Sequence, residues 1–320
     1  MKLRTMVAAL VLAGLMTFLY SAQSDPHESV ASDGSPAPPL ETTPTRIEPS
    51  PGTSARYPPP NAISDDELAG LNPPDTIQLV SLRQQVIEDD DRIWIPSPNP
   101  FPFRAVVHVK TASQSCSGWL IGSDTVITAG HCVHEKGKFT PVGKIVVASS
   151  IEGDEGKFKT PFPTCGAKRL YSTAGWTSTA DESFDYGAIK LDCKLGDLVG
   201  WLGAGDEPSP AGKRGQIAAY DPNTAEAACD TNGTFRKLCV AVGKPIMTIS
   251  GTQLFYDTDV EGGGSGAPVV VSTAPTFAVA IHGYSAKHNA LPLHKTLNHG
   301  VLITPRVFQN LLAWSKATTS

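Results

Sequence analysis

Three polar residues, far apart in the chain, stand in sequence surroundings that suit an acyl-transfer reaction. His131 follows the run TVITAG, Asp185 precedes the run YGAIKL, and Ser265 stands among glycines in EGGGSGAPVVV. A serine hydroxyl is a poor nucleophile unless a neighbouring base takes its proton. We therefore assign Ser265 as candidate nucleophile, His131 as general base and then acid, and Asp185 as the carboxylate that orients the imidazole and stabilises its cation.

The glycines around Ser265 predict a site for the negative oxygen of a tetrahedral intermediate. Glycine lets the backbone approach a substrate and turn its N–H groups inward. We expect the N–H groups of Gly263 and Ser265 to donate to that oxygen, and each such donor is typically worth about 3 to 4 kcal/mol. Each motif alone is weak, since a serine among glycines is usually a loop. Together, in the order His, Asp, Ser, they favour a serine peptidase.

Short β-prone runs, broken by Gly, Pro, Asn and Asp, must position these three residues. They begin near Ala105 and include AVVHVK, GWLIG, TVITAG, KIVVASS, YGAIKL, APVVV and TFAVAIHGY. Strands at this density predict an all-β sandwich or barrel. Only the end of the chain indicates a helix, with Thr304 as its cap, Pro305 at the first helical position and an apolar face: Val307, Phe308, Leu311 and Leu312.

The composition is that of a folded, exported protein. With 320 residues, 40% of them hydrophobic, and a net charge of -5, the chain can bury a core and lacks the basic patches of nucleic-acid binders. Lys2 and Arg4 precede an apolar run from Met6 to Tyr20. This run is shorter than the roughly 20 residues that cross a bilayer. Residues 1–23 are thus interpreted as a secretory signal peptide, with an uncleaved membrane anchor as the alternative.

After the signal, residues 32–60 have few large apolar side chains and many prolines. Such a segment cannot form a core, so we expect it to be extended or disordered. We predict a largely disordered pro-segment over 24–85 and a peptidase domain over 86–320, with a permanent linker as the alternative for the pro-segment. The mature protein is expected to be a secreted monomer that acts on protein or peptide substrates, without nucleic acid, membrane, metal or cofactor.

Six cysteines in an exported chain suggest up to three disulfides, although six cysteines allow about 15 pairings. Cys116 and Cys132 flank two strand-like runs that can form a hairpin, so we expect them to be bonded. The other two pairs rest mostly on elimination: Cys229 with Cys239, which would close a short loop, and Cys165 with Cys193.

Three blocks resemble the catalytic segments of the chymotrypsin-like serine peptidases: TAGHC, DYGAIKL and GGGSGAPV. The finer resemblance is to the glutamyl endopeptidases related to the staphylococcal enzyme. It covers roughly Val86 to Trp314 and includes VIEDDDR, FPFRAVVHV, YDTDVEGGGSGAPV and NHGVLITPRVFQNLLAW. The resemblance implies two packed six-stranded antiparallel β-barrels with the triad between them, a C-terminal helix, and synthesis as a zymogen.

The segment AIHGYS resembles the family segment that walls the specificity pocket, so Gly283 is expected in that wall. His282 falls on the family's pocket histidine. On its strand it is expected to share a face with Ala278 and Ala280, whose small side chains leave an imidazole room to meet a carboxylate, and Ser285 could donate a second hydrogen bond. This favours cleavage after glutamate, with aspartate as the alternative carboxylate.

One position departs from the family pattern. The staphylococcal-type enzymes carry a hydroxyl residue five positions before the serine, where this chain has Val260. Loss of that donor to a buried carboxylate could cost about 1 to 3 kcal/mol. A chymotrypsin-like endopeptidase of broader or different specificity is therefore kept as the alternative.

Two starting points for the mature enzyme compete. Cleavage after Arg92 would give a trypsin-like amino terminus, which needs an aspartate just before the nucleophile, and that position here is Gly264. The resemblance favours a start at Val86. By the same resemblance, the free amino group of Val86 helps to bind the substrate carboxylate.

Parts of the sequence are compatible with two other classes of function. A metallopeptidase is suggested by a dense group of possible ligands, His131, Cys132, His134 and Glu135, but the chain has no HExxH motif and Cys132 is expected to be oxidised. An inactive homologue that acts by binding usually lacks a triad member, and here all three are present.

Overall fold

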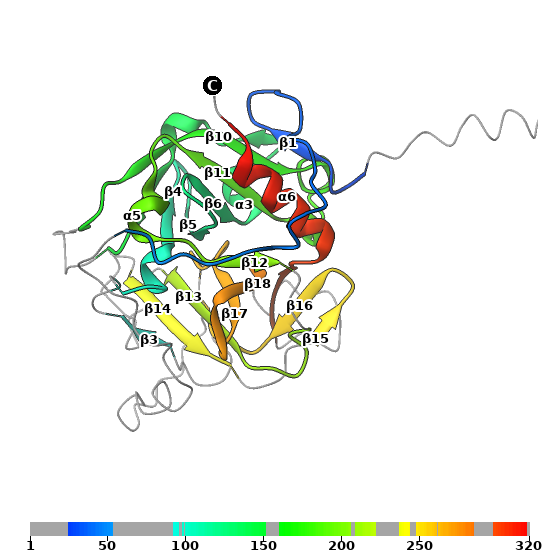
Figure 1. Cartoon of the computed structure of the whole chain (residues 1–320). Helices are drawn as coiled ribbons and strands as arrows, with labels where there is room; N and C mark the ends of the chain where they lie inside the picture. Colours follow the sequence, from blue (N-terminus) through cyan, green and yellow to red (C-terminus); the bar gives the residue numbers. More distant parts are fainter. Residues whose placement is uncertain are drawn as a thin grey trace, which may run out of the picture.

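The β-prone runs fold into two antiparallel sheets, which lie one above the other in Figure 1. The computed structural model describes residues 25–53, 92–95, 98, 100–151, 160–205, 209–221, 237–243, 248–260, 262–284 and 297–318. The predicted signal peptide, Val86 and Ser285 lie outside these residues. None of the described helices is long and apolar enough to cross a membrane.

The upper sheet contains a closed barrel of six strands. Their order is β10-β11-β6-β5-β4-β9, and a pairing of β9 with β10 closes the ring. The strands are β4 (Val106–Lys110), β5 (Ser115–Leu120), β6 (Thr125–Thr128), β9 (Val146–Ser149), β10 (Cys165–Thr173) and β11 (Gly187–Leu191).

Strands of this barrel are apolar on both faces because each face packs on a different core. Leu120 and Val126 point into the barrel, whereas their neighbours Trp119 and Ile127 join a second cluster that includes Trp314 of the C-terminal helix. Alternating side chains point to opposite faces of a strand. The continuous apolar runs therefore reflect strands buried on both sides.

The lower sheet has the order β15-β16-β19-β18-β17-β13-β14-β3, and β12 runs parallel to β18. Among the described residues its end strands are not joined to each other. Its strands are β3 (Ile93–Trp94), β12 (Gly203–Gly205), β13 (Gly215–Asp221), β14 (Lys237–Val242), β15 (Thr248–Ser250), β16 (Gln253–Tyr256), β17 (Pro268–Val271), β18 (Ala274–Tyr284) and β19 (Asn298–Leu302). This architecture confirms the predicted all-β, chymotrypsin-like fold.

The predicted C-terminal helix is α6 (Pro305–Lys316). The Thr304 side chain accepts a hydrogen bond from the Val307 N–H, and Pro305 takes the first helical position, where its missing N–H costs nothing. The other short elements are η1 (Phe103–Ala105), α3 (Gly130–Val133), β7 (His134–Glu135), β8 (Lys138–Phe139), η2 (Val142–Lys144), α4 (Ala174–Thr179), η3 (Glu182–Phe184) and α5 (Leu195–Val199).

Two disulfides lie on the upper barrel, Cys116–Cys132 and Cys165–Cys193, and both agree with the predicted pairing. Cys239 on β14 is also disulfide-bonded. Its predicted partner, Cys229, lies outside the described residues.

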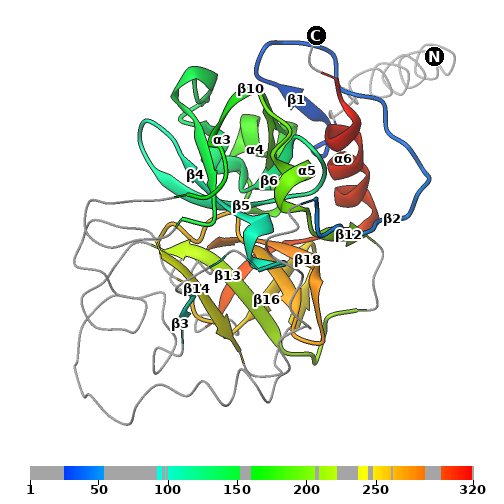
Figure 2. The same ribbon diagram turned by 60° about the vertical axis from the view of Figure 1, so that its left-hand side comes forward.

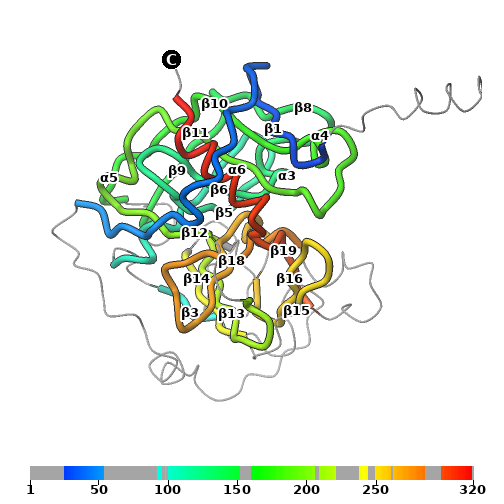
Figure 3. The backbone as a smooth tube through the Cα atoms, turned by 45° about the vertical axis from the view of Figure 1, so that its right-hand side comes forward, coloured from blue at the N-terminus to red at the C-terminus, as the bar shows by residue number. Residues whose placement is uncertain are grey.

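The predicted pro-segment departs from expectation over residues 25–53. These residues are mostly extended, as predicted, but they pack on the two sheets instead of lying free. β1 (Ser29–Ala31) adds an antiparallel strand to β10, and β2 (Arg46–Ile47) pairs with β12. Figures 2 and 3 show the segment passing beside α6 and reaching both sheets. The composition indicated that the segment cannot form a core of its own. It could not show that the segment packs against the core and the strand edges of the rest of the protein.

Candidate active site

His131 and Asp185 form a hydrogen-bonded pair at the edge of the upper barrel. Strand β6 ends at Thr128 and leads into α3, which carries His131, while Asp185 precedes β11. The His131 Nδ1 lies 2.6 Å from Asp185 Oδ2, and the His131 backbone N–H donates to Asp185 Oδ1 at 2.7 Å. Asp185 is fully buried and the His131 side chain is 20% exposed. The carboxylate therefore fixes both the ring and the backbone of the histidine.

This environment favours the imidazolium form of His131. Burial by itself lowers the pKa of His131, but the charge of Asp185 and its hydrogen bond outweigh burial, so the pKa is raised above its ordinary value. Glu135 and Glu182 act in the same direction. A base that must hold a proton during catalysis needs this stabilisation.

Gly130 gives the Asp185 carboxylate room to approach. A Cβ at this position would lie 2.8 Å from Asp185 Oδ1 and 2.8 Å from Cδ1 of the Trp176 ring. Real Cβ atoms do not come this close to other heavy atoms. The glycine of the TAGHC block is therefore required by the contact between the helix α3 and the carboxylate.

Tyr284 is a further partner of Asp185 that the sequence analysis missed. Burial raises the pKa of Tyr284 well above its ordinary value, and the charge of Asp185 and a hydrogen bond to it raise the pKa further. The phenol therefore stays protonated and donates to the carboxylate. Its ring stacks on His299 with centroids 5.4 Å apart and lies 5.7 Å from the His131 ring. Its place in AIHGYS was the available signal.

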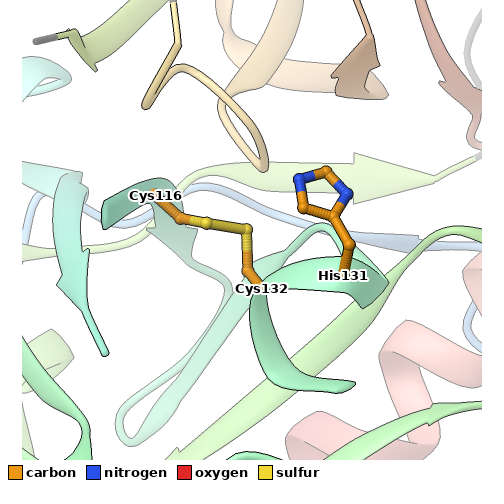
Figure 4. A group of neighbouring side chains, drawn as sticks. All are labelled: Cys116, His131 and Cys132. Atoms are coloured by element: carbon orange, nitrogen blue, oxygen red, sulfur yellow. A yellow bond between two sulfur atoms is a disulfide. The ribbon is translucent and has the colours of Figure 1, made fainter. Parts of the chain in front are cut away.

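Ser265 lies in the loop before β17. Strand β5 contacts both this loop and the helix that carries His131. Its carbonyl oxygen accepts from the Ser117 N–H at 2.9 Å and lies 3.8 Å from Cys132 Sγ. Figure 4 shows the His131 ring beside the Cys116–Cys132 disulfide. The disulfide thus joins β5 to the histidine helix α3, and the Ser117 N–H of β5 holds the serine loop.

The Ser265 hydroxyl donates to the Gly283 carbonyl oxygen at 3.4 Å, a long hydrogen bond. Within the described residues it makes no hydrogen bond to His131. Catalytic hydrogen bonds are often long or misaligned before substrate binds.

The backbone around Ser265 leaves two donors available. Gly263 and Gly266 have φ of +107° and +86°, a region that other residues rarely adopt. A Cβ on Gly266 would lie 2.1 Å from Thr128 Oγ1. In the described part of the chain, neither the Gly263 N–H nor the Ser265 N–H donates to a protein acceptor. These are the two predicted oxyanion donors.

Ser117 holds the glycine loop in place and was also missed from the sequence. It is fully buried on β5. Its hydroxyl donates to the Gly263 carbonyl oxygen at 2.9 Å and accepts from the Tyr220 N–H at 2.8 Å. Ser117 thereby connects the upper barrel with β13 of the lower sheet and with the candidate oxyanion loop. It is a small residue beside Cys116 with no motif to mark it.

His282 is buried in the lower sheet beside Tyr256, whose hydroxyl lies 2.7 Å from the His282 Nδ1. Burial lowers the pKa of His282 to about 3, and the nearby His299 and His131 also lower it. Burial holds the pKa of Tyr256 well above its ordinary value. Both groups are therefore neutral at neutral pH. Val260 is buried in the same apolar cluster as Tyr256.

The predicted common face of Ala278, Ala280 and His282 is only partly correct. Pairing of β18 with β19 is regular from Ala280 to His282, so these two residues share a face. The register with β17 shifts between Val269 and Val270, opposite Ala278 to Ala280. Ala278 accordingly packs in a different cluster from Ala280. A β-bulge of this kind interrupts the alternation on which the prediction relied.

Comparison with protein families matches residues 96–296 to the family described as Trypsin. The match spans more than half of the chain and includes His131, Asp185 and Ser265. The chain belongs to the trypsin family. The chymotrypsin-like serine-protease family inferred from the three catalytic blocks is thereby confirmed, and the finer resemblance to glutamyl endopeptidases is confirmed by the relative from Bacillus licheniformis.

The chain is also similar to individual peptidases. The chain is 30% identical over 237 residues to the glutamyl endopeptidase of Bacillus licheniformis, covering 73% of this chain and 70% of that protein. It is 29% identical over 322 residues to a Bacillus subtilis protein named extracellular metalloprotease, covering 97% of this chain and 94% of that protein. A solved Glu endopeptidase in complex with MPD has a TM-score of 0.61 at 19% identity, covering 72% of this chain and 100% of that chain, and shares its fold.

The Bacillus subtilis relative is named a metalloprotease, so side chains that could bind a metal are relevant here. Two groups of ligand-type side chains occur among the described residues: Cys116 with His131 and Cys132, and Cys165 with Asp192 and Cys193. In both groups the cysteines are disulfide-bonded and offer no thiolate. The Nδ1 of His131 also binds Asp185. These residues do not fit a metal site.

Proposed function

We propose that this trypsin-family chain is a secreted serine endopeptidase that hydrolyses peptide bonds through an acyl-enzyme. The observation that carries the proposal is the doubly hydrogen-bonded His131–Asp185 pair, with the Ser265 carbonyl oxygen held by the Ser117 N–H beside the disulfide of Cys132. A histidine fixed by a buried carboxylate beside a glycine-lined serine is the arrangement that activates a hydroxyl.

In the proposed reaction, His131 takes the proton of the Ser265 hydroxyl as Oγ attacks the carbonyl carbon of the substrate. The resulting oxyanion accepts hydrogen bonds from the N–H groups of Gly263 and Ser265. His131 then passes its proton to the leaving amine, which departs and leaves the acyl-enzyme. Water, deprotonated by His131, releases the acid by the same steps. Asp185 stabilises the imidazolium throughout.

We propose that the enzyme prefers glutamate, with aspartate as the weaker alternative, before the scissile bond. The similarity to the Bacillus licheniformis glutamyl endopeptidase supports this preference. Because His282 is neutral, it would bind a carboxylate as a hydrogen-bond donor and not as a cation. Donation from the Tyr256 hydroxyl to Nδ1 would keep the His282 proton on Nε2, where it can meet the substrate. Gly283 and Ser285 would complete the wall.

The apolar Val260 gives this pocket one polar partner fewer than the staphylococcal-type pattern. A hydrogen bond to a charged group contributes roughly 1.5 to 3 kcal/mol. We therefore expect the ratio of kcat/KM for glutamyl over other peptides to be lower than in enzymes with a hydroxyl residue at that position. The decrease should be at most about 10-fold to 150-fold, at 1.4 kcal/mol for each factor of ten.

Maturation is proposed to remove the signal peptide, residues 1–23, and to produce an amino terminus at or near Val86. The rival site follows Arg92, which is only 4% exposed and thus a poor target for a processing protease. Disulfide bonds are typical of proteins that fold outside the cytosol, which supports secretion. Amino-terminal sequencing of active enzyme tests this step, and a start at Ile93 would contradict it.

A serine-directed phosphorylating reagent tests the nucleophile. Intact-mass analysis should show one adduct on Ser265, with parallel loss of peptidase activity. Ser265→Ala should abolish both, while Ser272→Ala, which changes another buried serine outside the site, should retain both. Labelling elsewhere, or inhibition by a chelator without inhibition by the reagent, would refute the proposal.

A peptide library profiled with the same enzyme tests the pocket separately. Enrichment of glutamate before the cleaved bond is the expected result. Efficient cleavage without that enrichment would support the alternative of a broader serine endopeptidase. A Ser265→Ala protein that keeps its full biological effect would support a binding homologue instead.

A further inference from the structure

Residues 25–53, called here the N-terminal strap, are joined to the rest of the protein near both ends and in the middle. At one end, β1 pairs with β10 from Ser29 opposite Thr173 to Ala31 opposite Tyr171. In the middle, β2 pairs with β12. At the other end, Ser50 forms an antiparallel bridge with Trp201. The strap therefore contributes strand pairing to both sheets (Figure 3).

Buried polar groups of the peptidase domain depend on the strap for partners. The guanidinium of Arg104, which is 1% exposed, donates through Nη2 to the Pro51 carbonyl oxygen. The Trp314 indole N–H donates to Ser29 Oγ at 2.7 Å, and the Asn310 amide donates to the His27 carbonyl oxygen at 2.8 Å. A buried donor left without a partner is strongly destabilising. Departure of the strap would unpair these donors or expose them to water.

The surface beneath the strap is shaped by glycines that admit its backbone. A Cβ on Gly200 would lie 2.2 Å from the Ser50 carbonyl oxygen, and a Cβ on Gly205 would lie 2.5 Å from the Arg46 Cα. A close approach of two backbones is a position that only glycine allows. The surface of the peptidase domain at Gly200 and Gly205 thus matches the path of this segment.

Side chains of the strap add apolar and charged contacts. Ala31 is 6% exposed and belongs to the cluster between the barrels and α6, with Ile47 packed against it. Asp33 pairs with Arg169 at 2.7 Å, and Glu41 pairs with Lys316. Exposed ion pairs contribute little each. The buried contacts and the strand pairing therefore account for most of the binding.

The strap contacts the residues next to Asp185 in sequence and does not contact the other catalytic side chains. The His27 ring contacts Phe184 edge-on with centroids 4.7 Å apart, and its Nδ1 lies 2.9 Å from the Tyr186 hydroxyl. These two aromatic residues flank Asp185 in sequence. No hydrogen bond, ion pair or ring contact joins the strap to His131, Ser265 or His282 in the described ranges. The strap therefore lies where it can stabilise the segment that carries Asp185, and it does not lie where it would block the catalytic residues.

We propose that residues 25–53 remain bound after the chain is cut between the strap and the catalytic domain, as a light chain held without a covalent bond. The proposal rests on the maturation step proposed above. The strap contains no cysteine, so only non-covalent contacts can hold it. The surface beneath the strap is then a binding site for the enzyme's own N-terminal peptide.

Active enzyme purified from the culture medium provides the first test. Sequencing should give two amino termini in equal amounts, one near Asp25 and one at or near Val86, in a single peak on gel filtration. An active, folded enzyme with only the Val86 terminus and no strap would overturn the proposal.

A second test does not depend on catalysis. The full chain with Ser265→Ala receives a recognition sequence for a specific processing protease after Pro60, is cut, and is separated by gel filtration. The strap should co-elute with the domain at one copy per domain. Release of the strap from this protein, whether or not the domain then stays soluble, would overturn the proposal. Retention of the strap, with no peptidase activity in the Ser265 enzyme that begins at or near Val86, would refute the proposed function alone.

A matched pair of variants tests the contact itself. Ala31→Asp places a charge in the apolar cluster and should release the strap after cutting. Leu40→Asp places the same charge at a side chain that is 45% exposed and should leave it bound. If Ala31→Asp does not fold, hydrogen exchange of the cut parent protein tests whether the strap stays bound. The amides of Ser32 and Ser50, which donate to Leu170 and Trp201, should stay within about 10-fold of their protection before cutting, and full exchange would refute retention.

Discussion

Removal of the Tyr284 hydroxyl should weaken catalysis without removing any member of the triad. Asp185 accepts from the His131 N–H, from the His131 ring and from Tyr284. A hydrogen bond to a charged group is worth roughly 1.5 to 3 kcal/mol. If the bond holds the carboxylate in the orientation that the transition state requires, and that free energy is lost there, Tyr284→Phe should lower kcat by about 10-fold to 150-fold, at 1.4 kcal/mol for each factor of ten.

The pH profile separates this role from a structural one. Without the phenol donor, the Asp185 carboxylate is less neutralised and attracts the His131 proton more strongly. The pKa of His131, already raised, should rise further, and the acidic limb of kcat/KM should move to higher pH because catalysis needs the neutral imidazole. The assay is kcat and KM for one glutamyl peptide substrate across the pH range.

Tyr186→Phe is the matched control. It removes the same atom from a fully buried tyrosine next to Asp185, but that hydroxyl bonds to Asn310 and His27. It should lower thermal stability and leave the acidic limb unchanged. If Tyr284→Phe shows the parent pH profile and kcat, the reasoning is wrong. If it changes KM alone, Tyr284 acts on the substrate and not on Asp185.

Three further substitutions test the site. Asp185→Asn should lower kcat by about 10⁴-fold, the usual loss when a triad carboxylate is removed, and should move the acidic limb to lower pH because the main cause of the raised His131 pKa is gone. Gly266→Ala should reduce the melting temperature sharply in calorimetry, since its φ of +86° costs about 1 to 2 kcal/mol for other residues and its Cβ would overlap Thr128; a parent-like melting temperature would contradict the close contact. His282→Leu should reduce kcat/KM for glutamyl peptides by roughly 10-fold to 150-fold and leave leucyl peptides nearly unchanged; an equal loss on both would place His282 outside the pocket. In the parent enzyme, the glutamyl-to-leucyl ratio of kcat/KM should show no inflection near pH 6.5.

Residues that are marked by a local sequence motif could be predicted from the sequence. TAGHC, DYGAIKL and GGGSG each place one residue at the end of a strand, and strand ends are set by local patterning, so His131, Asp185 and Ser265 could be selected. The helix α6 was predictable for the same reason, because its cap and its apolar face are both local. Two disulfides also followed from short-range hairpin and elimination arguments.

What the sequence could not show were contacts between distant segments. Ser117 and Tyr284 acquire their roles only when the two sheets pack. Ser117 has no distinctive neighbour pattern, and the AIHGYS block that contains Tyr284 does not show that its hydroxyl meets Asp185. The bulge opposite Ala278 depends on the register between β17 and β18, which alternation cannot predict. The strap was expected to be loose because it lacks a core, but the strand edges and glycines that receive it lie more than 100 residues away.

The charge state of His282 explains why selectivity and catalysis should respond differently to pH. A histidine near its ordinary pKa would bind glutamate as a cation at low pH and lose that attraction as pH rises. With a pKa of about 3, His282 carries no charge in the free enzyme at any pH where His131 titrates. Because kcat/KM reports the free enzyme, the His131 titration affects all substrates equally and cancels in a ratio of two substrates. Discrimination then rests on a hydrogen bond from neutral imidazole, and its strength depends on the Tyr256 hydroxyl keeping the proton on the nitrogen that faces the substrate.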